Sequence, residues 1–140
     1  MSFDVLGDLN WLAVIVAAVA YFALGGLWFA QPVFGRAWIQ SSGIPMPEGG
    51  PGAAFYVGPF LTCLVATIAT AMLAEATGSN TFGEGIVLGL VVGIGLALPI
   101  VFVTGMFDPN KPQPLVWFAI SGGYHLVGLL VAAAIVASWT

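Results

Sequence analysis

Charged side chains are scarce in this sequence. Of its 140 residues, two are Lys or Arg, six are Asp or Glu and one is His, so 6% are charged. Soluble domains contain about 25% charged residues, and this chain therefore has too few to cover a water-soluble globule. Two cations also cannot form the basic patch that binds nucleic acid, and we expect no nucleic-acid partner.

Cysteine and histidine are almost absent as well. The single Cys63 cannot form a disulfide within the chain, and one Cys with one His cannot make a zinc cluster. The sequence contains no nucleophile–base pair, carboxylate dyad or phosphate loop. We therefore expect no enzymatic activity, no catalytic residue and no bound metal, and we interpret Cys63 as a small buried hydrophobe.

Apolar residues dominate what remains. They make up 60% of the chain, and the mean hydropathy is +1.06. About 20 apolar residues in a helix span the hydrocarbon core of a bilayer. Four segments reach this length, at residues 9–29, 53–76, 82–107 and 115–139. The short connections favour antiparallel neighbours, so we predict one transmembrane domain over residues 1–140, an all-α up-down bundle of four helices.

The two cations predict an orientation. Arg36 lies in the loop at 30–52 and Lys111 in the turn at 108–114, on the same side of the predicted bundle. The opposite side carries carboxylates and no cation. By the positive-inside rule, we expect both connections in the cytoplasm, both termini outside, and a bacterial inner membrane as the location.

Small residues recur at four-residue spacing in the predicted helices. Because lipid gives no hydrophobic drive for helix association, membrane helices pack through such residues. We predict a helix-packing interface, within the chain or between chains, and the glycine row of the third helix is its strongest part. The predicted residues are Gly85, Gly89, Gly93, Ala97, Ser121 and Gly128. Pro59 and Pro99 interrupt two helices and are expected to bend them.

Aromatic residues gather near the predicted helix ends, as is typical of a belt at headgroup depth. Residues 34–40 are expected to form a short amphipathic segment in the membrane interface, with Arg36 reaching phosphate headgroups. This segment would either anchor the first helix or bind a specific lipid. The predicted lipid-interface residues are Trp11, Trp28, Arg36, Trp38 and Trp117.

His125 is the strongest candidate for a functional side chain. It lies about ten residues into the fourth helix, close to the bilayer midplane, where a charge is costly and the ring is expected to be neutral. It could form an interhelical hydrogen bond, for instance to a Thr or a backbone carbonyl. It could also serve proton or solute passage, or bind a haem or chlorophyll-type pigment as a cofactor. A second haem-ligating histidine would have to come from a partner chain.

Two further polar pairs lie at helix ends. Thr81 and Glu84 have the spacing of a capping box, which satisfies backbone N–H groups at a helix start. Asp108 and Lys111 are expected to form a solvated turn pair of little energetic weight.

The stretch from Asn10 to Trp38 contains motifs that resemble those of a known protein family. It reads NWLAVIVAAVAYFALGGLWFAQPVFGRAW, with an Asn-Trp opening, a Gly-Leu-Trp-Phe helix end and a following Phe-Gly-Arg-Ala-Trp. In these motifs, and in GGYHLVG at 122–128, the chain resembles the bacterial membrane-protein family called domain of unknown function 1761, although the spacer residue in the helix-end motif is missing. The resemblance implies four membrane helices and no established activity.

These observations lead to one expected function and two alternatives. We expect a structural or accessory protein of the lipid bilayer that packs as a homo-oligomer or with other membrane subunits. The first alternative is an oligomeric channel or transporter for a small solute or protons. The second is a pigment- or haem-binding subunit that uses His125.

Overall fold

The computed structural model describes residues 2–45 and 52–139, and every regular element in this part is a helix. Four helical spans are long and apolar enough to cross a membrane, which confirms the predicted all-α membrane fold. Residues 46–51 of the predicted loop, and the two terminal residues, lie outside the described part. In chain order the elements are η1 (Phe3–Gly7), α1 (Trp11–Trp28), η2 (Gln31–Gly35), α2 (Arg36–Ser42), α3 (Ala54–Thr77), α4 (Phe82–Val92), η3 (Gly93–Ala97), α5 (Leu98–Met106) and α6 (Pro114–Ser138).

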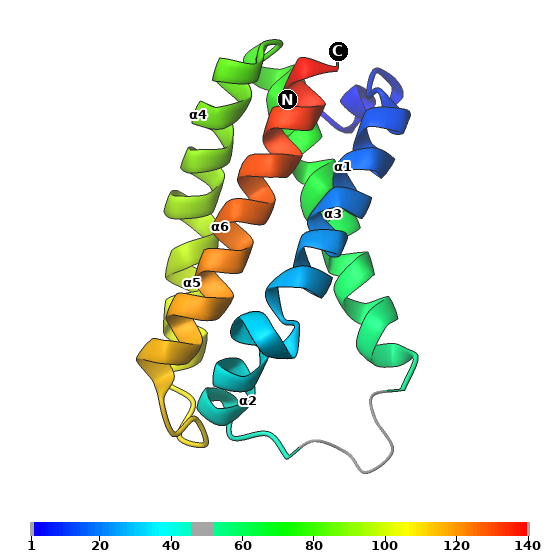
Figure 1. Ribbon diagram of the computed structural model, residues 1–140. Coiled ribbons are helices and arrows are strands. Elements are labelled where there is room, and N and C mark those ends of the chain that lie inside the picture. The colour runs from blue at the N-terminus through cyan, green and yellow to red at the C-terminus, as the bar shows by residue number, and fades with distance from the viewer. Residues whose placement is uncertain (1, 46–51, 140) are drawn as a thin grey trace.

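The described chain ends lie together at one end of the bundle, and α2 lies at the other end (Figure 1). At the first end, the Asn10 side-chain amide donates a hydrogen bond to the Trp139 carbonyl at 2.8 Å. At the second, Gly43 packs closely against the Asn110 carbonyl, so the connection after α2 meets the turn before α6. The first and third connections therefore lie on the same side of the bundle. In the following description these two ends are called the terminal end and the α2 end.

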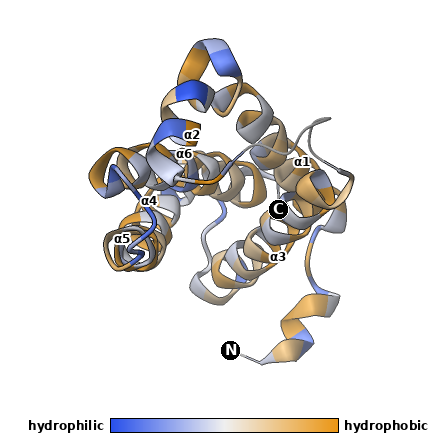
Figure 2. Ribbon diagram, turned by 90° about the horizontal axis from the view of Figure 1, so that it is seen from below, coloured by the Kyte–Doolittle hydropathy of each residue, from blue (hydrophilic) through white to orange (hydrophobic). Residues whose placement is uncertain are grey.

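Helix α6 is the centre of the molecule. It packs against α1, α2, α3, α4 and α5, and it lies between α1 and the α4–α5 pair when seen from below (Figure 2). Of its most apolar stretch, 56% is buried inside the protein, compared with 11% for the span Phe82–Met106. The span formed by α4, η3 and α5 is therefore peripheral, with most of its side chains directed away from the protein interior.

The glycine row of the third span faces α6 of the same chain. A Cβ at Gly85 would lie 2.7 Å from the Ala133 carbonyl, and one at Gly89 would lie 2.8 Å from the Leu130 Cα. Both contacts are with backbone, which cannot move aside as a flexible side chain can. Glycine at these positions therefore allows α4 and α6 to approach closely, in the manner of small-residue packing in membranes.

The other residues of the predicted packing interface also have contacts within the chain. Gly93 lies against Leu126, and Ala97 is half-buried against the core. Gly128 lies directly under the ring of Tyr21, where a Cβ would overlap that ring.

The third span is not one continuous α-helix. It changes to a π-helical turn at Gly93–Ala97, where the Leu98 N–H bonds the Gly93 carbonyl five residues back. Pro99 follows directly and has no N–H to continue the normal ladder. We expected Pro99 to bend this helix. The departure from α-helical geometry is a π-turn, and it lies on the N-terminal side of Pro99. Pro59 is accommodated within α3, where the Thr62 hydroxyl donates to its carbonyl at 2.8 Å.

Polar groups at two helix ends complete the fold. The Thr81–Glu84 capping box is present in full, as predicted. Lys111 pairs with Asp108 at 2.8 Å, but its side chain is only 8% exposed and its Nζ lies 4.4 Å from the Trp117 ring centre. The prediction of a solvated pair was therefore wrong for Lys111, because the indole covers it. The hydrogen bond from Lys111 lowers the pKa of the Asp108 carboxyl.

Candidate functional site

A cavity of about 500 Å³ opens at the α2 end. Its walls come from α1, η2, α2, α3 and one residue of α6, and Figure 1 shows the first turns of α3 lying apart from α6 at this end. Among residues 2–45 and 52–139, those that line it include no charged side chain and are rich in aromatic rings. The lining residues are Phe22, Gly25, Gly26, Phe29, Gln31, Gly35, Trp38, Ile39, Phe55, Tyr56, Pro59 and Tyr124. We call this space the aromatic cavity.

Glycines shape the α1 side of the aromatic cavity. A Cβ at Gly26 would meet no atom within 4 Å, so this residue leaves open space beside α1. Gly35 is buried, and a Cβ there would strike the Phe29 carbonyl. Only glycine fits this close approach, which lets the chain turn back after α1. The turn then places α2 against α6 rather than continuing the line of α1.

Tryptophans hold the α1 and α2 sides of the site in place against α6. The Trp28 indole N–H donates to the Ile120 carbonyl at 3.0 Å, and the Trp38 indole N–H donates to the Ser121 hydroxyl at 3.1 Å. The Phe29 ring packs edge-on against Trp38, with ring centres 5.3 Å apart. The walls are thus fixed by interhelical hydrogen bonds and aromatic contacts, and the indole N–H groups are already satisfied.

Tyr124 closes the inner end of the cavity. Its hydroxyl donates to the Tyr21 carbonyl at 3.3 Å and lies 3.3 Å from the Cys63 sulfur. Cys63 is buried, in keeping with its interpretation as a small core residue. Since the polar atom of Tyr124 has its partners within the protein, it adds an aromatic surface to the cavity rather than a free hydrogen-bonding group.

His125 lies behind this wall and does not line the cavity. Its Nδ1 is 2.6 Å from the Tyr21 hydroxyl, a contact that joins α6 to α1. In the tautomer with the proton on Nε2, the phenol donates and the imidazole accepts. The histidine therefore makes the predicted interhelical hydrogen bond, although its partner is a tyrosine rather than a Thr or a backbone carbonyl. Pigment or haem binding by His125, and a role in proton or solute passage, stay predictions.

The five predicted lipid-interface residues have different surroundings. Trp11 is 44% exposed, and its indole donates to the Leu6 carbonyl. Arg36 is exposed, whereas Trp117 is half-buried beneath the Lys111 ammonium group. Trp28 and Trp38 are half-buried and engaged with α6, as described above.

Several residues of the aromatic cavity were not singled out from the sequence. Phe22 of α1, Phe29 after its end, and Phe55 and Tyr56 of α3 all line it, and in sequence all four read as ordinary apolar residues. One signal was available at Gly26, where a missing side chain leaves room beside a helix, whereas a Cβ at the adjacent Gly25 would meet the Tyr124 phenol. That signal does not reveal which other segments surround the space.

Comparison with known proteins gives one match. The model of a family described as "Protein of unknown function (DUF1761)" matches residues 12–137, which is nearly the whole chain and agrees with the resemblance noted in the sequence. Searches of the curated proteins and of the solved structures found no match.

Proposed function

The chain belongs to the DUF1761 family, and we propose that it is a non-enzymatic protein of the bacterial inner membrane that holds an apolar molecule from the bilayer. The binding site is the aromatic cavity. Such a role is accessory in kind, because the protein would retain or present a molecule without changing it chemically.

The observation that carries this proposal is the cavity itself. Small-molecule sites commonly have volumes of about 300–1,000 Å³ and predominantly apolar walls, and the cavity of about 500 Å³ lies in this range. The Trp38 indole N–H and the Tyr124 hydroxyl, two of its polar groups, are engaged inside the protein. An apolar molecule would thus lose no hydrogen bond on entry, whereas a strongly polar one would find few partners, chiefly the Gln31 amide and the Tyr56 hydroxyl among the described lining residues.

The proposed orientation places the cavity toward the cytoplasm. Arg36 begins α2, and Lys111 follows Asn110, whose carbonyl contacts Gly43, so both cations belong to the α2 end. The positive-inside rule puts such an end on the cytoplasmic side. Both termini would then lie outside the cytoplasm, and the aromatic cavity would lie in the cytoplasmic leaflet.

A homo-oligomer, or a complex with other membrane subunits, is a second proposal. It is favoured by the large apolar outer surface of the span Phe82–Met106, of which 11% is buried within the chain. Gly85 and Gly89 face α6, so an assembly would use the opposite side of this span. Sedimentation in detergent tests this proposal: a species larger than one chain is expected, and a monomer at all concentrations contradicts it.

The binding role is tested by a matched pair of variants. Gly26→Leu places a side chain in the open space of the cavity, whereas Gly58→Leu adds the same side chain at an exposed α3 position that does not line it. Mass spectrometry of the intact chain released from detergent micelles counts retained molecules. We expect the wild type and Gly58→Leu to retain a bound molecule and Gly26→Leu to lose it. Equal retention by both variants contradicts the proposal.

A further inference from the structure

The position of the aromatic cavity along the helices indicates how an occupant would enter. Phe29 follows the last turn of α1, and Phe55 and Tyr56 lie in the first turns of α3. These are the ends of two membrane spans, at the depth where lipid headgroups meet acyl chains. Phe22 lines the same cavity about two turns deeper along α1. The space therefore extends from headgroup depth into the hydrocarbon region, as a lipid does.

The charges around the cavity point to an anionic headgroup. Among the described residues, Lys111 forms an ion pair with Asp108 and lies over the Trp117 ring, whereas Arg36 has no ion pair. Arg36 is exposed and follows Gly35 directly in the chain. Gly35 lines the cavity, as do residues of the next turn of α2. A guanidinium group binds phosphate through two parallel hydrogen bonds. In the described part of the chain, Arg36 is the cation without an ion pair, and it is the sequence neighbour of an uncharged lining. This combination matches a molecule with an apolar tail and an anionic head.

We infer that the aromatic cavity binds one acyl chain of an anionic phospholipid, whose phosphate is held by Arg36. This inference rests on the proposed function and narrows it to one class of ligand. The tail lies between α1 and α3, against Phe29 and Tyr56, and the headgroup remains at the α2 end.

Photo-crosslinking with defined lipids tests the inference. The full chain is placed in phosphatidylcholine vesicles that contain a trace of lipid with a photoactivatable group on its acyl chain. The trace lipid is either phosphatidylglycerol or phosphatidylcholine. Peptide mass spectrometry then measures labelling of residues 22–29 and 55–59. For one cation beside an anionic lipid, we expect about fivefold more labelling with phosphatidylglycerol.

Three variants separate headgroup recognition from tail binding. Arg36→Gln should reduce phosphatidylglycerol labelling to the phosphatidylcholine level, and Arg36→Lys should keep most of the preference. Lys111→Gln should leave the preference unchanged. Equal labelling by the two lipids in the wild type, or an unchanged preference in Arg36→Gln, overturns the inference.

A cavity variant distinguishes failure of this inference from failure of the proposed function. If both lipids label the wild type equally and Gly26→Leu abolishes the labelling, the cavity binds tails without selecting the headgroup, and only the inference is overturned. If Gly26→Leu labels as the wild type does, the cavity is not the site and both proposals are overturned. Circular dichroism of each variant, with Gly58→Leu as the reference, establishes that helix content is retained.

Discussion

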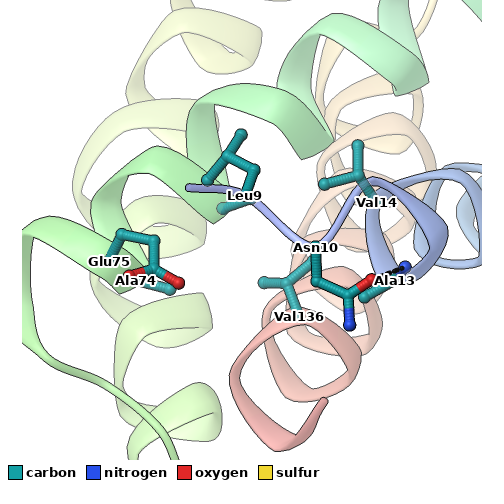
Figure 3. A pocket seen from close by; sticks show the side chains of 8 residues that line it. Leu9, Asn10, Ala13, Val14, Ala74, Glu75 and Val136 are labelled. Atoms are coloured by element: carbon teal, nitrogen blue, oxygen red, sulfur yellow. Dashed lines mark hydrogen bonds between the residues drawn. The ribbon is translucent and has the colours of Figure 1, made fainter. Parts of the chain in front are cut away.

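The two ends of the bundle are built in opposite ways. At the terminal end, Leu9, Ala13, Ala74 and Val136 converge, and the space left between them is about 10 Å³, room for about one water molecule (Figure 3). At the α2 end, aromatic side chains surround a cavity of about 500 Å³. The same helices, α1, α3 and α6, contribute to both ends, so the difference comes from their side chains and their separation.

Side-chain size accounts for this difference. Small residues such as Ala17 and Ala133 are fully buried toward the terminal end, where they let the helices approach closely. Along α3, the first turns from Phe55 to Pro59 are exposed, and burial begins at Cys63. Close packing at one end thus provides a rigid support, and large rings at the other end hold the walls of a cavity apart.

The largest expected effect comes from breaking the close packing. Gly89→Leu forces a side chain against the Leu130 backbone, and overpacking of this kind costs typically about 1–3 kcal/mol and occasionally more. We expect a loss at the upper end of this range, because backbone cannot yield. Reversible unfolding in mixed detergent micelles measures it. A stability equal to that of the wild type would show that α4 and α6 are not in close contact.

A smaller effect is expected from the hydrogen bond that joins α1 to α6 behind the cavity. Tyr21→Phe keeps the ring over Gly128 but removes the hydroxyl that contacts His125. Interhelical hydrogen bonds in membranes average about 0.6 kcal/mol and reach about 1.7 kcal/mol, so we expect a loss of about 1 kcal/mol. In the double-mutant cycle, Tyr21→Phe should have little effect once His125 is replaced by Ala. Additive losses would argue against the contact.

The cavity end should tolerate a substitution that the close-packed end does not. Gly26→Leu adds the same side chain as Gly89→Leu, but into open space. We expect its free energy of unfolding to stay within about 0.5 kcal/mol of the wild-type value in lipid-free detergent. The same unfolding assay provides the comparison. A loss as large as that of Gly89→Leu would mean that the cavity is filled by protein.

The smallest expected effect concerns the Asp108–Lys111 pair at the α2 end. Because the pKa of Asp108 is lowered by its hydrogen bond with Lys111, the pair contributes stability above the unfolded-state pKa of about 3.9. This contribution is lost as the pH falls through the lower folded-state pKa. The wild type should therefore be slightly more stable than Asp108→Asn at neutral pH and equal to it in acid. A difference that persists unchanged in acid would contradict this assignment.

The sequence predicts the membrane spans well because hydropathy over about 20 residues reflects a simple physical requirement. The span predicted at 53–76 is observed at Ala54–Thr77. Helical spacing also identified Gly89 as part of a packing face. It could not identify α6 as the neighbour, because a period describes one helix and not the arrangement of several.

The cavity and the π-turn are beyond such reasoning. The aromatic cavity depends on where α2 turns back and on how far α3 separates from α6, and both are properties of the assembled bundle. His125 stood out in the sequence as the only histidine, whereas Tyr124, its neighbour, forms the cavity wall. The sequence therefore pointed to His125, which lies beside the cavity, rather than to Tyr124, which lines it.

The most direct test of the account is an experimental structure of the full chain crystallised from a lipid mesophase. The account predicts continuous elongated density between Phe29 and Tyr56 that ends near Arg36, with Trp38 still bonded to Ser121. A structure in which α3 closes onto α1 and the aromatic side chains fill the space themselves would contradict it.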